Sequence, residues 1–276
     1  MNHHIFIGIY IFSLWISGGR LAARCPALRL DRDKLKKEKN EQPLLPEPDA
    51  MAAASLPHPE VVSPEEVRPH RLNLHEPLFG IDVSHYQGRI DWVTVAQHDH
   101  VTYTYVKATE GAGMLDDTYQ YNIREARKAG IKVGCYHFFS PTASPDDQFA
   151  NFIRNVNLKE HDLLPIIDVE IKGRGDTRSF CKRLQTFLNK VEKHYGICPI
   201  IYTSCNFYNQ YLAGKFTKYK YMIARYHEER PVLEDDIQFV MWQFTASGNI
   251  PGIRGAVDRS CFMDDYSLND ILLPTK

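Results

Sequence analysis

The sequence predicts a single shortened (β/α)-barrel of the TIM type, preceded by a disordered N-terminal extension. From Leu78 onward, short apolar runs alternate with amphipathic helical stretches, a pattern that favours a largely parallel sheet. About eight candidate strands fall within roughly 195 residues, which is compact for a fold that usually takes about 250. Polar residues follow the apolar runs, as expected where barrel strands end at a shared rim.

The first 77 residues differ in composition from the rest of the chain. Residues 1–25 contain an apolar run from Ile5 to Ser17, which is shorter than the ~20 residues of a membrane span and suits an export signal. We favour an export signal or short membrane anchor; a lipidated Cys25 and a misassigned start are the alternatives. Residues 26–77 hold nine of the sixteen prolines and the charged run DRDKLKKEKNEQ, which favours a disordered linker.

Eight short segments of the expected barrel domain, residues 78–276, have the composition of strands. They are rich in β-branched and aromatic residues and end in polar ones. In chain order they are LFGIDVS (78–84), YTYVKATE (103–110), IKVGCYHFF (131–139), LLPIIDVE (163–170), PIIYTS (199–204), KYMIARY (220–226), FVMWQF (239–244) and, more weakly, GAVDRS (255–260).

Three helices with recognisable ends are expected between these strands, at residues 118–130, 144–157 and 176–196. Gly130 and Gly196 stand where C-terminal caps belong. Ser144 is a candidate N-cap, and Pro145 follows it at the first helical position, where proline is tolerated best. Apolar residues recur at helical spacing in the third segment.

Charge and cysteine content exclude several classes of function. The formal net charge is -1, from 33 basic and 34 acidic residues, so we expect no nucleic-acid partner. None of the six cysteines forms a CxxC pair, which argues against structural zinc, and the five after residue 78 are expected to be mostly free, buried thiols. The HDH run at residues 98–100 favours a solvated loop over a metal site. We expect a monomer without metal or organic cofactor.

The segment LLPIIDVE ends an apolar run with two carboxylates, Asp168 and Glu170. Residues two apart in a strand point to the same face, so both side chains should project together. Mutual repulsion and burial should raise one pKa and leave the other group ionised, and we expect Glu170 to hold the proton and Asp168 the charge. Such a pair suits glycoside hydrolysis. An ion-pair network with Arg225 or Lys107 is the alternative.

A set of motifs resembles the glycoside hydrolase family 25 lysozymes. These are GIDVSHYQGRIDW (80–92), KATEG, DDTYQYNIREARKAGIKVGCYHFF, PIIDVE, IYTS and WQF, in that family's order, and the resemblance runs from about Phe79 to Leu272. It implies a shortened β/α-barrel that cleaves the β-1,4 bond between N-acetylmuramic acid and N-acetylglucosamine. It also implies peptidoglycan glycan strands as the partner and an exported location.

The resemblance also assigns roles by position. Glu170 matches the general acid, and Asp168 matches the carboxylate that supports developing positive charge or positions the substrate N-acetyl group. Asp82 and Asp258 match cleft aspartates of the first and last strands. Residues at positions expected to contact sugar are Tyr136, Tyr202 and Gln243.

Three further candidates for sugar binding have plain structural alternatives. Glu110 could bind sugar or serve only as the partner of Lys107. His137 could contact ligand or pack at a strand end. Trp242 borders the rim and offers an aromatic face suited to sugar rings.

Two other functions compete with the muramidase hypothesis. A catalytically inactive cell-wall polysaccharide-binding protein on the same barrel would tolerate loss of its acids, but all four are present. A chitinase-type enzyme would carry further acids two and five residues before the DxE pair, where this chain has Ile166 and Leu163.

Overall fold

The computed structural model describes residues 78–97 and 101–274. The predicted export segment (residues 1–25), the predicted linker (26–77) and the HDH run (98–100) lie outside the described residues. Within the described ranges, no helix is both long and apolar enough to cross a bilayer.

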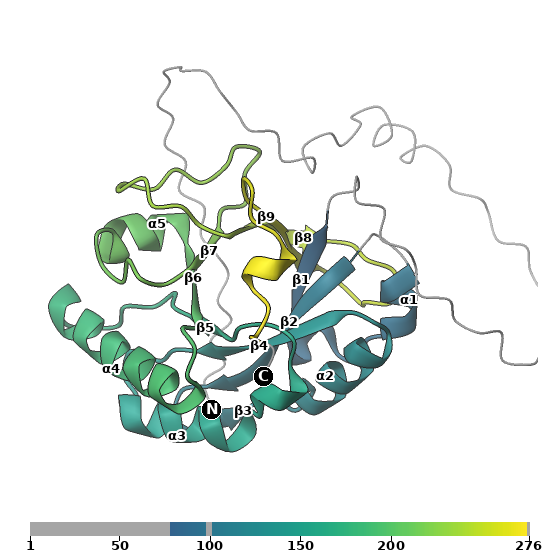
Figure 1. Cartoon of the computed structure of the whole chain (residues 1–276), viewed down its shortest axis with the longest axis horizontal. Coiled ribbons are helices and arrows are strands. Elements are labelled where there is room, and N and C mark those ends of the chain that lie inside the picture. Colours follow the sequence, from purple (N-terminus) through teal and green to yellow (C-terminus); the bar gives the residue numbers. More distant parts are fainter. Residues whose placement is uncertain (1–77, 98–100, 275–276) are drawn as a thin grey trace, which may run out of the picture.

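The predicted barrel is confirmed, because eight strands of the described residues close into one sheet (Figure 1). β1 pairs with β2 on one side and with β9 on the other, which closes the ring. From β1 to β8 the barrel strands run parallel, whereas β9 is antiparallel to both of its neighbours. The barrel strands are β1 (Phe79–Val83), β2 (Val101–Glu110), β4 (Lys132–Phe138), β5 (Ile166–Asp168), β6 (Ile200–Ser204), β7 (Tyr221–Ala224), β8 (Met241–Gly248) and β9 (Val257–Phe262).

Helices lie on the outer side of this sheet (Figure 1). They are α1 (Trp92–Gln97), α2 (Tyr119–Lys128), α3 (Pro145–Asn155), α4 (Thr177–Tyr195) and α5 (Cys205–Phe207). The three predicted helices correspond to α2, α3 and α4. The Ser144 hydroxyl accepts a hydrogen bond from the Asp146 amide at the start of α3, and Gly196 ends α4 with a φ of 70°. The sequence did not indicate the two-residue strand β3 (Met114–Leu115), which pairs with the end of β2.

Strand residues alternate between the barrel interior and the helix-facing side. The interior cluster includes Tyr103, Tyr105, Ile166, Ile200, Met222 and Met241, and the cluster under the helices includes Ile81, Val106, Ile167, Ile201, Ile223 and Trp242. Gly80 makes room for the Tyr103 ring, because a Cβ added to Gly80 would lie 2.0 Å from Tyr103 Cε2. Large tyrosines from β2 thereby fill the barrel beneath its rim.

The antiparallel direction of β9 determines which of its residues reach the rim of the barrel. Asp258 is the second residue of β9, and it lies directly opposite Asp82 of β1 in the sheet register. The beginning of β9 therefore meets the carboxyl end of β1. A residue near the start of the last strand joins residues from the ends of the parallel strands.

The cysteines are largely as predicted. Cys135 and Cys205 are buried free thiols and Cys181 is a partly buried one, whereas Cys198 is exposed.

Candidate active site

A cleft of about 300 Å³ opens at the carboxyl-terminal rim of the barrel, and all four acids singled out in the sequence line it. Asp82 comes from β1, Asp168 is the last residue of β5, Glu170 follows two positions later, and Asp258 comes from β9. Asp168 is buried, while Glu170 is exposed beyond the end of the strand. The fold therefore gathers four carboxyl groups that are up to 176 residues apart (82 to 258) into one small space.

Asp82 and Asp258 face each other across the β1–β9 pair, and their pKa values differ. Although Asp82 retains some exposed surface, protein atoms enclose it, and this burial, followed by the Asp258 charge, raises the pKa of Asp82 to about 8. Burial and the Glu170 charge raise the pKa of Asp258 to about 6. Between pH 6 and pH 8, Asp82 is mostly protonated and Asp258 mostly ionised, so this pair supplies a neutral acid and an anion.

Burial also has the largest effect on the pKa values of Asp168 and Glu170, the pair at the end of β5. It raises the pKa of Asp168 well above the usual range, and the neighbouring Glu170 charge adds to this. Although Glu170 keeps exposed surface, the protein atoms around it raise its pKa, and the nearby Tyr202 hydroxyl and the Lys107 charge lower it in part. Asp168 lies deeper than Glu170, so burial favours the proton on Asp168, contrary to the prediction that Asp168 carries the charge. The pair titrates as a unit.

Gln243 connects three walls of the cleft. Its Nε2 donates to Asp82 Oδ2 at 2.7 Å, and its Oε1 accepts from the hydroxyls of Tyr202 and Tyr226, each at 2.8 Å. Two hydroxyl donors on Oε1 fix the orientation of the amide, so the NH₂ group must face Asp82. Gln243 thereby holds an acid of β1 against tyrosines from β6 and from the segment after β7.

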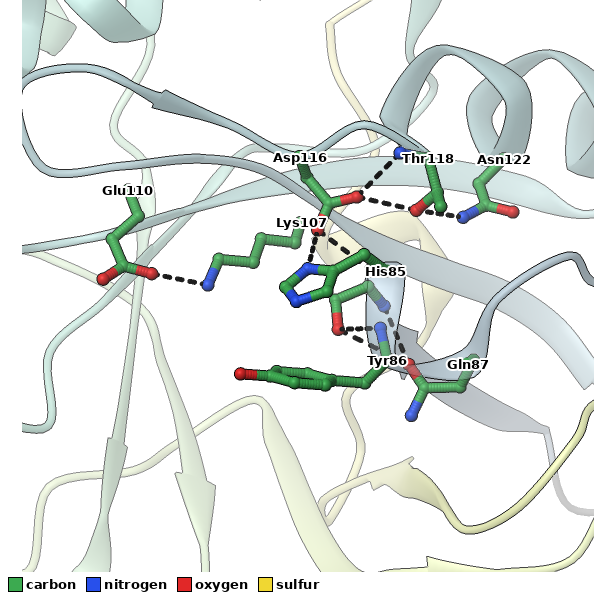
Figure 2. A network of polar contacts seen from close by, with 9 residues as sticks. His85, Tyr86, Gln87, Lys107, Glu110, Asp116, Thr118 and Asn122 are labelled. Carbon is green, nitrogen blue, oxygen red and sulfur yellow. Dashed lines mark hydrogen bonds and ion pairs between the residues drawn. The ribbon is translucent and has the colours of Figure 1, made fainter. Parts of the chain in front are cut away.

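Lys107 brings a positive charge to the cleft wall. Its side chain is 9% exposed, and its ammonium group forms an ion pair with Glu110 Oε2 at 2.7 Å (Figure 2). It also lies 5.4 Å from the centroid of the Phe138 ring. Because Lys107 lowers the pKa of both Asp168 and Glu170, it opposes the effect of burial on them.

Aromatic side chains form much of the remaining lining. Tyr136 and Tyr202 line the cleft, as predicted from their positions, and Met222 contributes an apolar surface. Two exposed tyrosines that the sequence did not single out, Tyr86 and Tyr226, also line it. Tyr86 stands in the turn after β1, where no strand or helix period marks a functional position, whereas Tyr226 belongs to the predicted strand 220–226 but follows the end of β7.

Three predicted sugar-binding residues lie outside the cleft lining, and strand alternation explains two of them. His137 and Trp242 are the outward neighbours of Tyr136 and Gln243. His137 is fully buried against Phe187, with Thr109 Oγ1 2.7 Å from its Nδ1, and burial lowers its pKa to about 3. The Trp242 indole is 1% exposed and donates to the Arg225 carbonyl. Glu110 lies outside the lining as the partner of Lys107. We therefore correct the assignments of His137 and Trp242, which pack away from the cleft, whereas for Glu110 the ion pair favours one of the two roles that the sequence left open.

The arrangement offers acid–base chemistry. Asp82 and Asp168 line the cleft, and one buried carboxyl oxygen of each, Oδ1, has no hydrogen-bond partner among the described residues. Glu170 is the exposed member of the group and can reach a bound molecule from the cleft mouth. A proton donor beside an anion, within aromatic walls, meets the requirements for cleaving a glycosidic bond.

Comparison with known proteins supports this chemistry. The model of the family "Glycosyl hydrolases family 25" matches residues 81–253. The chain is 36% identical to the YegX protein of Escherichia coli K12 over 189 residues, which cover 67% of this chain and 69% of that protein. It is 30% identical to Lysozyme M1 of Streptomyces globisporus over 200 residues, which cover 66% of this chain and 67% of that protein.

Solved structures show the same similarity. A family 25 glycosyl hydrolase from Bacillus anthracis superposes with a TM-score of 0.64 at 30% identity, covering 71% of this chain and 93% of that one. A lysozyme from Streptomyces coelicolor superposes with a TM-score of 0.64 at 28% identity, covering 71% and 96%. Matched across most of the described barrel in sequence and in fold, the chain belongs to glycoside hydrolase family 25 and is a glycoside hydrolase of the lysozyme type.

Proposed function

We propose that this protein is an N-acetylmuramidase, which cleaves the β-1,4 bond between N-acetylmuramic acid and N-acetylglucosamine in peptidoglycan, with Glu170 as the general acid. The observation that carries the proposal is the convergence of four carboxyl groups in one cleft, with Glu170 alone exposed at its mouth. The names of two relatives, Lysozyme M1 and the autolytic lysozyme of Clostridium acetobutylicum, support the choice of substrate.

Glu170 suits the role of proton donor for two reasons. Burial raises its pKa, so a larger fraction is protonated near neutral pH than for an ordinary glutamate. Its exposure lets it approach the oxygen of the scissile bond. The Lys107 charge, which lowers the pKa of Glu170, stabilises the carboxylate that remains after the proton has left.

The other three acids would act on the sugar that develops positive charge. Asp168 lines the cleft and, when protonated, would donate a hydrogen bond to the substrate N-acetyl group. Asp258, ionised above about pH 6, supplies negative charge near an oxocarbenium-like centre. Asp82, held by Gln243, stays neutral to about pH 8 and limits repulsion between the acids.

Sugar contacts in this proposal come from Tyr136, Tyr202 and Gln243, with Tyr226 added from the structure. Each lines the cleft. The Tyr226 ring is 54% exposed although its hydroxyl is bound to Gln243, so its ring is both available and fixed in place. Tyr136 and Tyr202 lie deeper, beside Asp168.

We further propose that residues 1–25 direct export or anchor the protein, that residues 26–77 are a linker, and that residues 78–276 form the hydrolase domain, acting as a monomer. Peptidoglycan lies outside the cytoplasmic membrane, so the proposed substrate requires export. Fractionation of cells that produce the full chain, compared with cells that produce the chain without residues 1–25, tests this. Equal amounts outside the cytoplasm from both would contradict it.

Product analysis tests the proposed activity. The full chain is incubated with purified peptidoglycan and, separately, with chitin, and new reducing ends are identified by mass spectrometry. We expect reducing-end muramic acid from peptidoglycan and no release from chitin. Binding to peptidoglycan without any release would instead indicate a polysaccharide-binding protein, and N-acetylglucosamine ends would show a different bond specificity.

A further inference from the structure

We propose that Tyr86 forms a stacking subsite for one sugar ring of the glycan strand on the β1 side of the cleft, and that Asp116 positions it through His85. This inference rests on the proposed function and specifies how the same cleft holds its substrate. Tyr86 would act in binding, and His85 and Asp116 would act as positioning residues.

The first observation is the exposure of the Tyr86 ring. Tyr86 is 81% exposed, more than any other large hydrophobic residue that is exposed in the described ranges, yet it lines the cleft together with Glu170 and Lys107. An aromatic face beside a polar cleft matches the apolar C–H face of a pyranose ring, with the phenol hydroxyl free to meet sugar hydroxyls. Such an exposed ring buries little apolar surface on folding, and stacking against a bound sugar would bury more of it.

The second observation is that this exposed ring stands on a tightly fixed turn. The Ser84 amide donates to Gln87 Oε1 at 2.9 Å, and the Tyr86 amide donates to Ser84 Oγ at 3.3 Å. Gln87 Nε2 then donates to the carbonyl of Ala256, immediately before β9, at 3.1 Å. The turn after β1 is thus tied both to itself and to the strand that carries Asp258. A preorganised contact loses less entropy when ligand binds.

The third observation is the support beneath the ring. Asp116 Oδ2 accepts hydrogen bonds from the His85 amide at 3.0 Å and from His85 Nδ1 at 2.8 Å, and Oδ1 accepts from the amide and hydroxyl of Thr118 (Figure 2). The Asp116 side chain is fully buried. Burial raises the pKa of Asp116, but the hydrogen bonds from Thr118 and His85 outweigh it and hold the pKa below its usual value. Asp116 is therefore an anion, and His85 Nδ1 must carry the hydrogen.

The His85 ring, fixed in this way, packs on Tyr86. The two ring centroids are 4.1 Å apart with an angle of 38° between the planes. His85 thus backs one side of the Tyr86 ring, and the high exposure of Tyr86 leaves the rest of the ring open. The chain of contacts from Thr118 through Asp116 and His85 sets the direction in which the ring faces the cleft.

Binding and kinetics of Tyr86 variants test the subsite. The full chain carrying Glu170→Gln is titrated calorimetrically with a tetrasaccharide of alternating N-acetylglucosamine and N-acetylmuramic acid, with and without Tyr86→Ala. We expect about tenfold weaker binding from loss of the ring. In the otherwise unaltered enzyme, Tyr86→Ala should act mainly on KM for peptidoglycan, and Tyr86→Phe, which keeps the ring, should recover most of the affinity. The control Val232→Ala alters an exposed apolar residue outside the cleft.

The outcomes separate the subsite from the proposed function. If the unaltered enzyme releases no muramic acid ends, the proposed function fails whatever Tyr86 does. If it releases them while Tyr86→Ala changes neither KM nor tetrasaccharide affinity by more than about twofold, the subsite is refuted and the function stands.

A double-mutant cycle tests the positioning by Asp116. Asp116→Asn keeps the shape but weakens the bond from His85, so it should weaken tetrasaccharide binding when Tyr86 is present and have no further effect on binding in the Tyr86→Ala background. Equal losses in both backgrounds would show that Asp116 acts only on the fold and would overturn its positioning role. The Tyr86 variants remain informative even if Asp116→Asn does not fold, because Tyr86 itself is exposed.

Discussion

Replacing Asp82 with asparagine should remove much of the pH dependence of stability of the barrel. In the folded protein the pKa of Asp82 is raised from 3.8 to about 8 by burial and by the Asp258 charge. Between pH 3.8 and about pH 8, Asp82 keeps its proton in the folded state but has lost it in the unfolded state. Stability from this group is therefore complete below about pH 4 and is lost as pH rises to about 8.

The size of the effect follows from the same values. Each pKa unit corresponds to about 1.36 kcal/mol, so ionising Asp82 in the folded protein costs at most about 6 kcal/mol. Part of this comes from Asp258, and the open side of the cleft screens the charge, so we take about 3 kcal/mol. For a domain of this size that is roughly 6–12 °C in Tm. Asparagine keeps the oxygen that accepts from Gln243 and cannot ionise.

Thermal unfolding of the full chain from pH 4 to pH 9 measures this. The Tm of Asp82→Asn should be close to that of the unaltered protein at pH 4 and exceed it by roughly 6–12 °C at pH 9. Asp91→Asn is the matched control: hydrogen bonds from Thr94 lower the pKa of Asp91 below its usual 3.8, so its effect on stability changes only at lower pH, and the Tm difference of this variant should stay nearly constant from pH 4 to pH 9. A Tm difference for Asp82→Asn that is the same at both ends of the range would refute the reasoning.

Three further substitutions probe the cleft and its corrected boundary. Lys107→Met should raise the pKa of Glu170 and move the alkaline limb of the pH–rate profile to higher pH. Lys218→Met is the control, because its partner Glu192 lies outside the cleft. An alkaline limb that stays in place or moves to lower pH would contradict this. Gln243→Leu leaves three hydrogen bonds of the cleft unmade, one of them buried, so kcat/KM should fall at least about tenfold; a change below about twofold would count against this role. Trp242→Phe should lower unfolding stability by about 1–3 kcal/mol in denaturant titrations without raising KM, whereas a raised KM would return Trp242 to the sugar site.

Much of the fold could be predicted because its signals are local. The apolar runs gave all eight barrel strands, and the caps at Ser144 and Gly196 lie where the sequence indicates them. The direction of the last strand was not predictable in this way, since GAVDRS has the same composition whichever way it runs. Its antiparallel pairing depends on contacts with β1 that are distant in sequence.

The residues of the candidate site were also only partly predictable from the sequence. Two pairs of adjacent residues, Tyr136 with His137 and Trp242 with Gln243, were all predicted to bind sugar, although neighbours in a strand face opposite sides. Strand alternation alone would have allowed only one of each pair. The contribution of Tyr86 could not be predicted from local pattern, because it depends on how a turn is held by Asp116, 30 residues further along the chain.

The relative protonation of the acids also required the structure. The spacing of Asp168 and Glu170 predicts that they share a cleft, which is how they lie. It does not predict which is deeper, and depth determines where burial raises the pKa more. Asp168 ends β5 inside the barrel and Glu170 lies beyond the strand, so burial favours the proton on Asp168, whereas we expected it on Glu170.

The role of Glu170 is tested most directly by the single variant Glu170→Gln, which keeps the size and hydrogen-bonding capacity of the side chain but removes the acidic proton. Release of muramic acid reducing ends from peptidoglycan and calorimetric affinity for the tetrasaccharide are measured on the full chain. We predict that kcat falls by about 10²- to 10⁴-fold while affinity stays within a few-fold. Turnover close to that of the unaltered enzyme would contradict the assignment of Glu170 as the general acid.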